Sequence, residues 1–256
     1  MFAAAKRGGV VTHPRQWTAR VLDTLPHDSQ AFTQGLEMSS GRLYESTGMP
    51  GRSTAHYGPP GRPYAVSVAL GPKLFGEGLT VLGGEVWQLT WRDGVVIVRD
   101  AETLAERRRV SYDGEGWGLC HQAQERRFVM SDGTARLVFR DSVTFVALGS
   151  VTVTDVGRPV ALLNELECTG RTVLANVLGS DTIVGVDTRT GKVIDRIDAS
   201  AVLPVRPIEN VLNGIAAIPG TDEYWITGKN WPYLYRVTFA SASSRSADRT
   251  FGLSER

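Results

Sequence analysis

A short motif recurs five times along this chain. In each copy a polar or aromatic residue precedes a glycine, once a glutamate, and then leucine or isoleucine follows. The copies are Gln34-Gly35-Leu36, Glu77-Gly78-Leu79, Trp117-Gly118-Leu119, Asn164-Glu165-Leu166 and Asn213-Gly214-Ile215. Their middle residues are 43, 40, 47 and 49 residues apart. A period in this range indicates an array of equivalent supersecondary units.

Further strand-like runs follow each copy of the motif. A second and a third run occur in every repeat, and a fourth occurs in four of them. Glycine-bearing turns such as residues 187–192 separate the runs. No stretch shows a sustained helical period of apolar residues. We therefore predict an all-β chain, because four short antiparallel strands in each of five repeats are typical of a five-bladed β-propeller.

The two ends of the chain suggest how such a ring closes. The last repeat has no fourth strand, whereas residues 17–25 form a strand-like run that belongs to no repeat. We predict that this N-terminal run is the outer strand of the last blade. The expected organisation is a flexible segment at 1–16, a single propeller domain at 17–239 and a polar C-terminal tail at 240–256.

Composition excludes several classes of partner. The 256 residues include 28 Lys or Arg and 27 Asp or Glu, so no basic excess indicates nucleic acid or an anionic membrane. No apolar run approaches the roughly 20 residues that span a bilayer. Residues 1–15 lack the apolar stretch of a secretory signal. We expect a cytoplasmic monomer, or an exported protein if the true start lies upstream.

The cysteines and histidines show no metal-ligand spacing, so a zinc site is not expected. Cys120 and Cys168 lie on the first strands of adjacent repeats, one and two residues after the motif's leucine. Because side chains alternate along a strand, this difference turns the two thiols to opposite faces. We predict two buried free thiols rather than a disulfide.

Polar and aromatic residues are expected to meet at one end of the ring. The first strand of each blade lines the central channel, so the five motifs bring their variable residues to one funnel. Two further residues, just after the second runs of their repeats, point to the same end. The set is Gln34, Glu77, Trp117, Asn164, Asn213, Trp91 and Lys229. The alternative is that these side chains only hydrate the channel or satisfy strand-end backbone groups.

These segments resemble a known family, the plant and bacterial glutaminyl-peptide cyclotransferases. The resemblance runs from about residue 25 to 239. It is carried by Ala31-Phe32-Thr33-Gln34-Gly35-Leu36, Phe75-Gly76-Glu77-Gly78, Gln88-Leu89-Thr90-Trp91, Gly114-Glu115-Gly116-Trp117, Asn164-Glu165-Leu166-Glu167, Val211-Leu212-Asn213-Gly214-Ile215 and Thr227-Gly228-Lys229. It implies a five-bladed propeller and an acyltransferase that cyclises the N-terminal glutamine of peptides to pyroglutamate, releasing ammonia without catalytic zinc.

The resemblance also implies an active site. It places there Phe32, Gln34, Glu77, Trp91, Trp117, Asn164 and Lys229. The chemistry suggests Glu77 as the proton shuttle and Lys229, Asn164 and Gln34 as donors to the developing oxyanion. Phe32, Trp91 and Trp117 would wall the pocket, and Asn213 joins the substrate-binding set by its place in the ring.

One residue departs from the family pattern. The family commonly carries Ala-Asn-Val-Trp where this chain reads Ala175-Asn176-Val177-Leu178, which predicts a wider pocket. Glu115 and Glu165 are expected to have structural roles near the channel, with a bound Ca²⁺ as an open alternative to a metal-free arrangement.

Two rival functions remain, a non-catalytic peptide-binding propeller and a metal-dependent lactonase or lyase.

Overall fold

The computed structural model describes residues 13–202 and 210–242, and most of these residues lie in β-strands. The described helices are two short 3₁₀ turns, η1 (Ala123–Glu125) and η2 (Ser200–Val202). No helix in the described part is long and apolar enough to cross a membrane. The all-β prediction is confirmed. The expected flexible segment at 1–16 and tail at 240–256 fall mostly outside the described residues.

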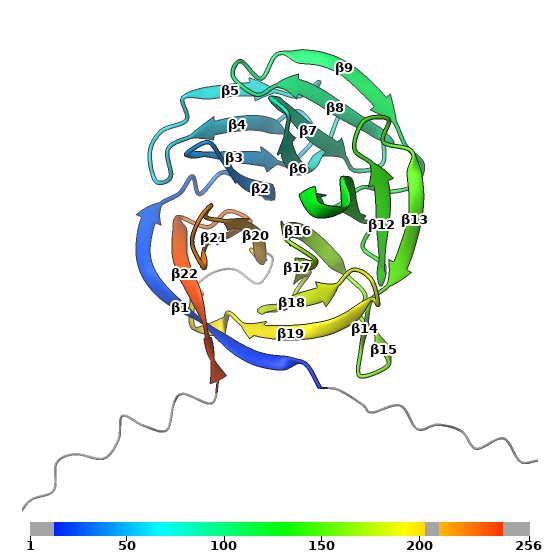
Figure 1. Ribbon diagram of the computed structural model, residues 1–256. Helices are drawn as coiled ribbons and strands as arrows, with labels where there is room; N and C mark the ends of the chain where they lie inside the picture. Colours follow the sequence, from blue (N-terminus) through cyan, green and yellow to red (C-terminus); the bar gives the residue numbers. More distant parts are fainter. Residues whose placement is uncertain (1–12, 203–209, 243–256) are drawn as a thin grey trace, which may run out of the picture.

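Most strands form groups of four in which chain neighbours pair antiparallel, arranged around a common centre (Figure 1). The first group is β2 (Thr33–Ser39), β3 (Arg42–Thr47), β4 (Thr54–Gly58) and β5 (Val66–Ala69). The second is β6 (Gly76–Leu82), β7 (Glu85–Thr90), β8 (Val95–Asp100) and β9 (Glu106–Ser111). The third is β10 (Leu119–Gln122), β11 (Arg127–Ser131), β12 (Arg136–Asp141) and β13 (Ala147–Thr152).

The last two groups belong to one larger sheet. The fourth group is β16 (Leu163–Thr169), β17 (Thr172–Val177), β18 (Thr182–Asp187) and β19 (Lys192–Asp198). The short strands β14 (Thr154–Asp155) and β15 (Arg158–Pro159) lie beside β19. The fifth group contains β20 (Leu212–Ala217), β21 (Glu223–Gly228) and β22 (Tyr233–Ser241).

Strand β1 (Arg15–Pro26) connects these two groups. It pairs antiparallel with β22, from Trp17 opposite Ser241 to Pro26 opposite Tyr233. Its first residues also pair parallel with β19, with Arg15 opposite Asp195. The start and end of the described chain therefore lie side by side (Figure 1).

The motif glycines lie where the first strands of neighbouring groups approach most closely. A Cβ atom added to Gly35 would lie 2.5 Å from the Leu79 nitrogen, and one on Gly118 would lie 2.1 Å from the Asn164 carbonyl oxygen. A side chain does not fit at such positions, which explains the repeated glycine. The exception is Glu165, whose carboxylate accepts hydrogen bonds from the main-chain N–H groups of Leu36 and Ile215.

The prediction of free thiols is wrong, because Cys120 and Cys168 form a disulfide with Cα atoms 5.5 Å apart. Leu119 packs with Trp87 toward the second group, whereas Cys120 packs with Leu166 toward the fourth. The two cysteines do point from opposite faces of their own sheets. The sheets follow one another around a ring, however, so one face of the third sheet packs against the opposite face of the fourth. Cys120 lies on the first of these faces and Cys168 on the second, and the two thiols therefore meet between the sheets.

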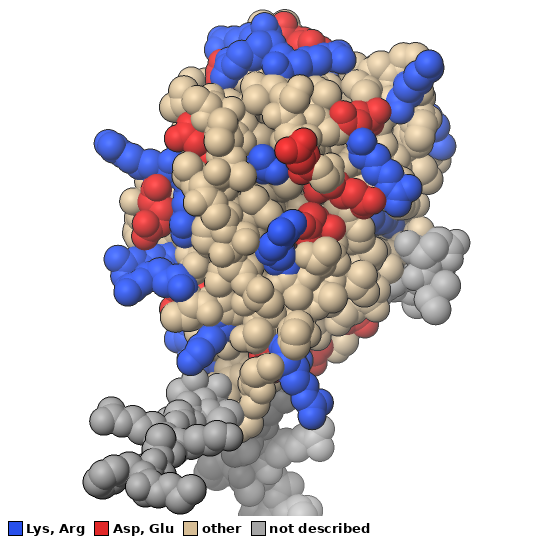
Figure 2. Space-filling view, turned by 90° about the vertical axis from the view of Figure 1, so that its right-hand side faces the viewer, with Lys and Arg blue, Asp and Glu red and all other residues tan. Residues whose placement is uncertain are grey.

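Charged side chains of both signs are interspersed on the side of the molecule shown in Figure 2. The run of three arginines in β9 is paired with acids. Arg108 contacts Glu85 at 2.5 Å and Arg109 contacts Glu106 at 2.8 Å. This run is therefore locally neutralised rather than a free basic patch.

Candidate functional site

A cavity of about 230 Å³ lies at one end of the ring of first strands. Seven of the eight predicted site residues line it: Phe32, Gln34, Glu77, Trp91, Trp117, Asn164 and Lys229. Leu178, the position that departs from the family pattern, lines it too, together with Met49 and Phe75. The eighth residue, Asn213, is fully buried and contacts Gln34. The sequence therefore identified most of the cavity wall.

β-Bulges lie at the motif in most of the first strands. The pairing register shifts at the motif in four of the five first strands, at Thr33/Gly35, Gly76/Leu79, Leu163/Leu166 and Leu212/Ile215. The first shift leaves the variable residue Gln34 as the extra one. In the other three shifts the variable residue and the one after it lie opposite a single residue of the second strand. A bulge bends the strand locally and changes the direction of a side chain. The same motif thus provides the glycine for close packing and a side chain for the site.

Amide side chains hold Glu77 through a short relay. Asn213 Nδ2 donates to the Thr33 carbonyl oxygen at 2.9 Å and to Gln34 Oε1 at 3.2 Å. Gln34 Nε2 then donates to Glu77 Oε1 at 3.2 Å. Asn213, which was placed in the substrate-binding set by its position in the ring alone, therefore orients the Gln34 amide so that its NH₂ group faces the carboxyl of Glu77.

Burial dominates the ionisation of the two charged residues in the cavity. Desolvation raises the pKa of Glu77 well above the usual 4.5, against the opposing effect of the Lys229 ammonium, and the negative charge of Glu115 raises it further. Desolvation lowers the pKa of Lys229, although the carboxylate of Glu77 opposes this. A carboxyl with a raised pKa in a cavity is suited to exchange protons near neutral pH.

Asn164 offers an unused acceptor at the cavity wall. The residue is 2% exposed, and its Oδ1 atom has no hydrogen-bond partner among the described residues. An unpaired buried acceptor is unfavourable unless a ligand or water supplies a donor. This side chain is thus suited to bind an N–H group of a ligand in the cavity.

Glu115 clamps the two tryptophans of the cavity. Its Oε2 atom accepts the indole N–H of Trp91 at 2.8 Å and that of Trp117 at 3.2 Å. Its Oε1 atom accepts from Arg92 at 2.9 Å, and the Arg92 guanidinium stacks 3.9 Å from the Trp91 ring centroid. Partial burial would raise the pKa of Glu115, but the hydrogen bonds from Trp117, Arg92 and Trp91 outweigh it and lower the pKa. Glu115 is therefore a charged structural residue.

One aromatic residue of the cavity wall, Phe75, was not among the predicted site residues. Phe75 lies 6.4 Å from Phe32 and 5.5 Å from Trp91, measured between ring centroids. Lys229 Nζ lies 4.6 Å from the Phe32 centroid. Phe75 precedes Glu77 by two residues, just as Phe32 precedes Gln34, and side chains two residues apart share a side of an extended strand. This spacing could have identified Phe75.

A second polar cluster, centred on Glu45, lies next to Thr33, the residue before Gln34. Glu45 accepts from Thr33 Oγ1 at 2.6 Å, and its other oxygen lies 3.2 Å from His27 Nε2 and 2.8 Å from His56 Nε2. His27 Nδ1 lies 2.8 Å from the Trp231 carbonyl oxygen. Burial would raise the pKa of Glu45, but the two histidines hold it well below its usual range. Burial would lower the pKa of His27, but Glu45 outweighs it and raises the pKa.

The described residues contain no group of three or more His, Cys, Asp or Glu side chains arranged to hold a metal ion. The carboxylate of Glu165 accepts two main-chain N–H groups, and that of Glu115 accepts indole and guanidinium N–H groups. Ca²⁺ prefers a shell of about six to eight oxygen ligands, whereas the oxygens of these two carboxylates are each hydrogen-bonded to N–H donors.

Comparisons with known proteins agree on one family. The sequence model of the family described as glutamine cyclotransferase matches residues 1–239. The chain is 32% identical over 244 residues to an Arabidopsis thaliana protein named glutaminyl-peptide cyclotransferase, covering 89% of this chain and 73% of that protein.

A solved structure gives the same result. Myxococcus xanthus glutaminyl cyclase superposes with a TM-score of 0.82 at 36% identity, over 90% of this chain and 100% of that one. Kuenenia stuttgartiensis hydrazine synthase shares only the fold, with a TM-score of 0.50 at 16% identity over 85% of this chain and 64% of that one. The chain belongs to the glutamine cyclotransferase family.

Proposed function

We propose that this protein is a glutaminyl-peptide cyclotransferase, which converts the N-terminal glutamine of a peptide to pyroglutamate and releases ammonia. Family membership and the names of its relatives support this activity. The observation that carries the proposal is the buried carboxyl of Glu77, with its raised pKa, in an aromatic cavity beside Lys229 and Asn164. An acid that exchanges protons and a set of polar donors are what the reaction needs.

Glu77 moves the proton in this scheme. The substrate's α-amine attacks its own side-chain carboxamide carbon, so nucleophile and electrophile are tethered and orientation is the main task of the enzyme. A peptide α-amine has a pKa of about 7.7, so a usable fraction is unprotonated at neutral pH. As the new C–N bond forms, Glu77 accepts the amine proton. It then gives the proton to the amide nitrogen, which leaves as ammonia when the old C–N bond breaks.

Lys229 and Asn164 stabilise the oxygen that gains negative charge during the attack. Both are buried and fixed near strand ends, so they are preorganised donors. The unpaired Oδ1 of Asn164 can also accept an N–H of the substrate. Gln34 has a positioning role in addition, because its NH₂ group already contacts Glu77.

The aromatic walls press the glutamine side chain into its cyclising shape and exclude water. Trp91 and Trp117 are held by Glu115, and Phe32 and Phe75 pack edge to face. Leu178 provides a smaller surface than the tryptophan common in the family. The cavity is thus expected to accept the substrate more loosely on that side.

We also infer that the five strand groups are the blades of a five-bladed propeller closed by β1, acting as a monomer. The strand pairings of β1 with β22 and β19 support this closure. We propose that no zinc or calcium takes part, because the cavity supplies a carboxyl and N–H donors for every proton and charge in the scheme.

The activity is tested by incubating the protein with a peptide that begins with glutamine and following the mass loss of ammonia, with and without a chelator. The control is the same peptide with its α-amine acetylated, which lacks the nucleophile. Cyclisation of the free peptide in both conditions supports the proposal. Tight binding without turnover would indicate a non-catalytic peptide-binding propeller, and loss of turnover with chelator would indicate a metal enzyme.

A further inference from the structure

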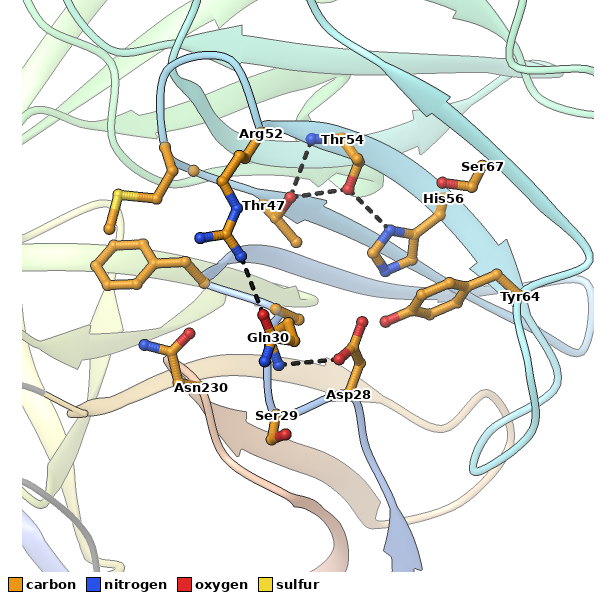
Figure 3. Close-up of a pocket in the computed structure, with 14 residues that line it drawn as sticks. Asp28, Ser29, Gln30, Thr47, Arg52, Thr54, His56, Tyr64, Ser67 and Asn230 are labelled. Atoms are coloured by element: carbon orange, nitrogen blue, oxygen red, sulfur yellow. Dashed lines mark hydrogen bonds between the residues drawn. The ribbon is translucent and has the colours of Figure 1, made fainter.

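A second cavity, of about 470 Å³, adjoins the site. It shares two lining residues, Phe32 and Met49, with the smaller cavity that contains Glu77. Its remaining lining is mostly polar (Figure 3). We call it the side groove. Met49 is 40% exposed, so the boundary between the two cavities is open to solvent on that side.

We propose that the side groove holds the peptide residues that follow the N-terminal glutamine, and that Arg52 gives the enzyme a preference for substrates with a carboxylate there. This inference rests on the proposed function. A cavity of about 230 Å³ is smaller than the roughly 300–1,000 Å³ of sites for drug-sized ligands, so it suits one residue. The rest of the peptide must leave past the cavity wall, and the side groove adjoins that wall at Phe32 and Met49.

Arg52 places a positive charge in the side groove, close along the chain to Met49, which lines both cavities. It lies in the same turn as Met49, since its main-chain N–H donates to the Met49 carbonyl oxygen at 3.0 Å. Its guanidinium donates to Gln30 Oε1 at 3.2 Å, and Figure 3 shows it reaching across the groove toward that residue. None of the ion pairs within residues 13–202 and 210–242 involves Arg52. Its charge is thus available to a ligand.

The acidic residue of the side groove, Asp28, already has hydrogen-bond partners. Asp28 accepts the main-chain N–H of Gln30 at 2.9 Å and hydrogen-bonds the hydroxyl of Tyr64. Figure 3 shows Asp28 and Tyr64 facing each other, away from Arg52. The side groove therefore contains a cation without an ion-pair partner among the described residues, Arg52, near the cavity that holds Glu77. Its anion, Asp28, already accepts hydrogen bonds from other residues of the groove. This arrangement favours a carboxylate close behind the substrate glutamine.

Two substrate sources share this chemistry. One is an Asp or Glu side chain at the second position of a longer peptide, and the other is the C-terminal carboxylate of a dipeptide. An amidated tripeptide of sequence Gln-Glu-Ala, compared with amidated Gln-Gln-Ala, tests the side-chain source. The dipeptide Gln-Ala with a free carboxylate, compared with its amide, tests the C-terminal source.

The experiment measures kcat/KM for these four substrates with the wild type, Arg52→Met and Arg62→Met. Arg62 is an exposed arginine in a neighbouring loop that does not line the side groove, so it controls for net charge. An exposed ion pair contributes modestly, so we expect a preference for at least one carboxylate substrate on the order of two- to fivefold. Arg52→Met should abolish the preference and Arg62→Met should retain it. The preference should also shrink in about 1 M salt, where the screening length is about 3 Å.

Equal kcat/KM for the charged and neutral members of both pairs would overturn the inference while leaving cyclisation intact. A preference that survives in Arg52→Met, or that Arg62→Met removes equally, would overturn the assignment to Arg52. If the wild type cyclised none of the four substrates, the proposed function would fail and this inference with it. Thermal unfolding of each variant, expected near the wild-type midpoint because both arginines are exposed, checks that the fold is retained.

Discussion

Gly118→Ala is the sharpest test of the link between the repeated motif and the site. An added Cβ would lie 2.1 Å from the Asn164 carbonyl oxygen, 2.8 Å from Leu166 Cγ and 2.9 Å from Glu165 Cα. Gly118 cannot simply move aside, because its N–H donates to Ser131 Oγ at 2.7 Å and its carbonyl accepts the Ser131 N–H at 3.1 Å. The substitution must therefore separate two first strands.

The size of the effect follows from this geometry. A carbon–oxygen contact needs about 3.3 Å, so the strands must separate by roughly 1 Å. Overpacking a core typically costs about 1–3 kcal/mol, and a clash with main-chain atoms belongs at the upper end, so we expect about 3 kcal/mol. At about 2–4 °C per kcal/mol for a domain of this size, Tm should fall by roughly 6–12 °C. A 1 Å displacement of Asn164 should also lower kcat by on the order of 100-fold.

The assay is thermal unfolding by circular dichroism, followed by cyclisation rates at a temperature where the variant is still folded. Gly71→Ala is the matched control, since the nearest atom to its added Cβ is 3.9 Å away and belongs to the Leu74 side chain. That variant should match the wild type or gain about 0.4–1 kcal/mol by restricting the unfolded chain. A Gly118→Ala protein with wild-type Tm and kcat would refute the close-packing explanation of the motif.

Three further results are expected. Replacing both cysteines of the Cys120–Cys168 disulfide with alanine should cost about 4 kcal/mol by chain entropy for a separation of 48 residues, measured by denaturant unfolding; an unchanged midpoint would contradict it. The acidic limb of kcat, which does not contain the titration of the unbound substrate amine, should lie above pH 4.5 because Glu77 must lose its proton to act as a base, and Glu115→Gln should move that limb to lower pH by removing a negative charge; a limb that stays in place would argue against Glu77. Deleting residues 1–25 should lower Tm far more than deleting the C-terminal tail, because it removes a strand paired to two others; equal tolerance of both deletions would contradict ring closure by β1.

The repeated motif made much of the cavity predictable. Its glycine and apolar residues mark first strands, and equivalent positions in an array around a centre must point to a common region. Gln34, Glu77, Trp117 and Asn164 were predicted in this way to lie together, although they are up to 130 residues apart in the sequence. Asn213 followed from the same symmetry, but its hydrogen bond to Gln34 depends on side-chain geometry that spacing does not contain.

Features that depend on contacts between sheets were harder to predict. The alternation of side chains along a strand correctly predicted that Cys120 and Cys168 lie on opposite faces of their sheets. It does not predict which faces of neighbouring sheets pack together, and so it missed the disulfide. Met49 sits in a loop with φ of 100°, where no periodic pattern applies. His27 and His56 meet at Glu45 only because β1 ends beside the first group, so their shared partner has no local signal.

The most direct measurement of the central claim is the cyclisation rate of Glu77→Gln. Glutamine keeps the shape of the side chain but can neither accept nor deliver the proton, and general acid–base groups typically contribute about 10²–10⁴-fold. We therefore predict a loss of at least about 100-fold in kcat with Tm retained. Glu125→Gln, which changes an exposed carboxylate in η1 that does not line the cavity, should keep the wild-type rate. A folded Glu77→Gln protein that cyclises glutamine peptides at the wild-type rate would contradict the account.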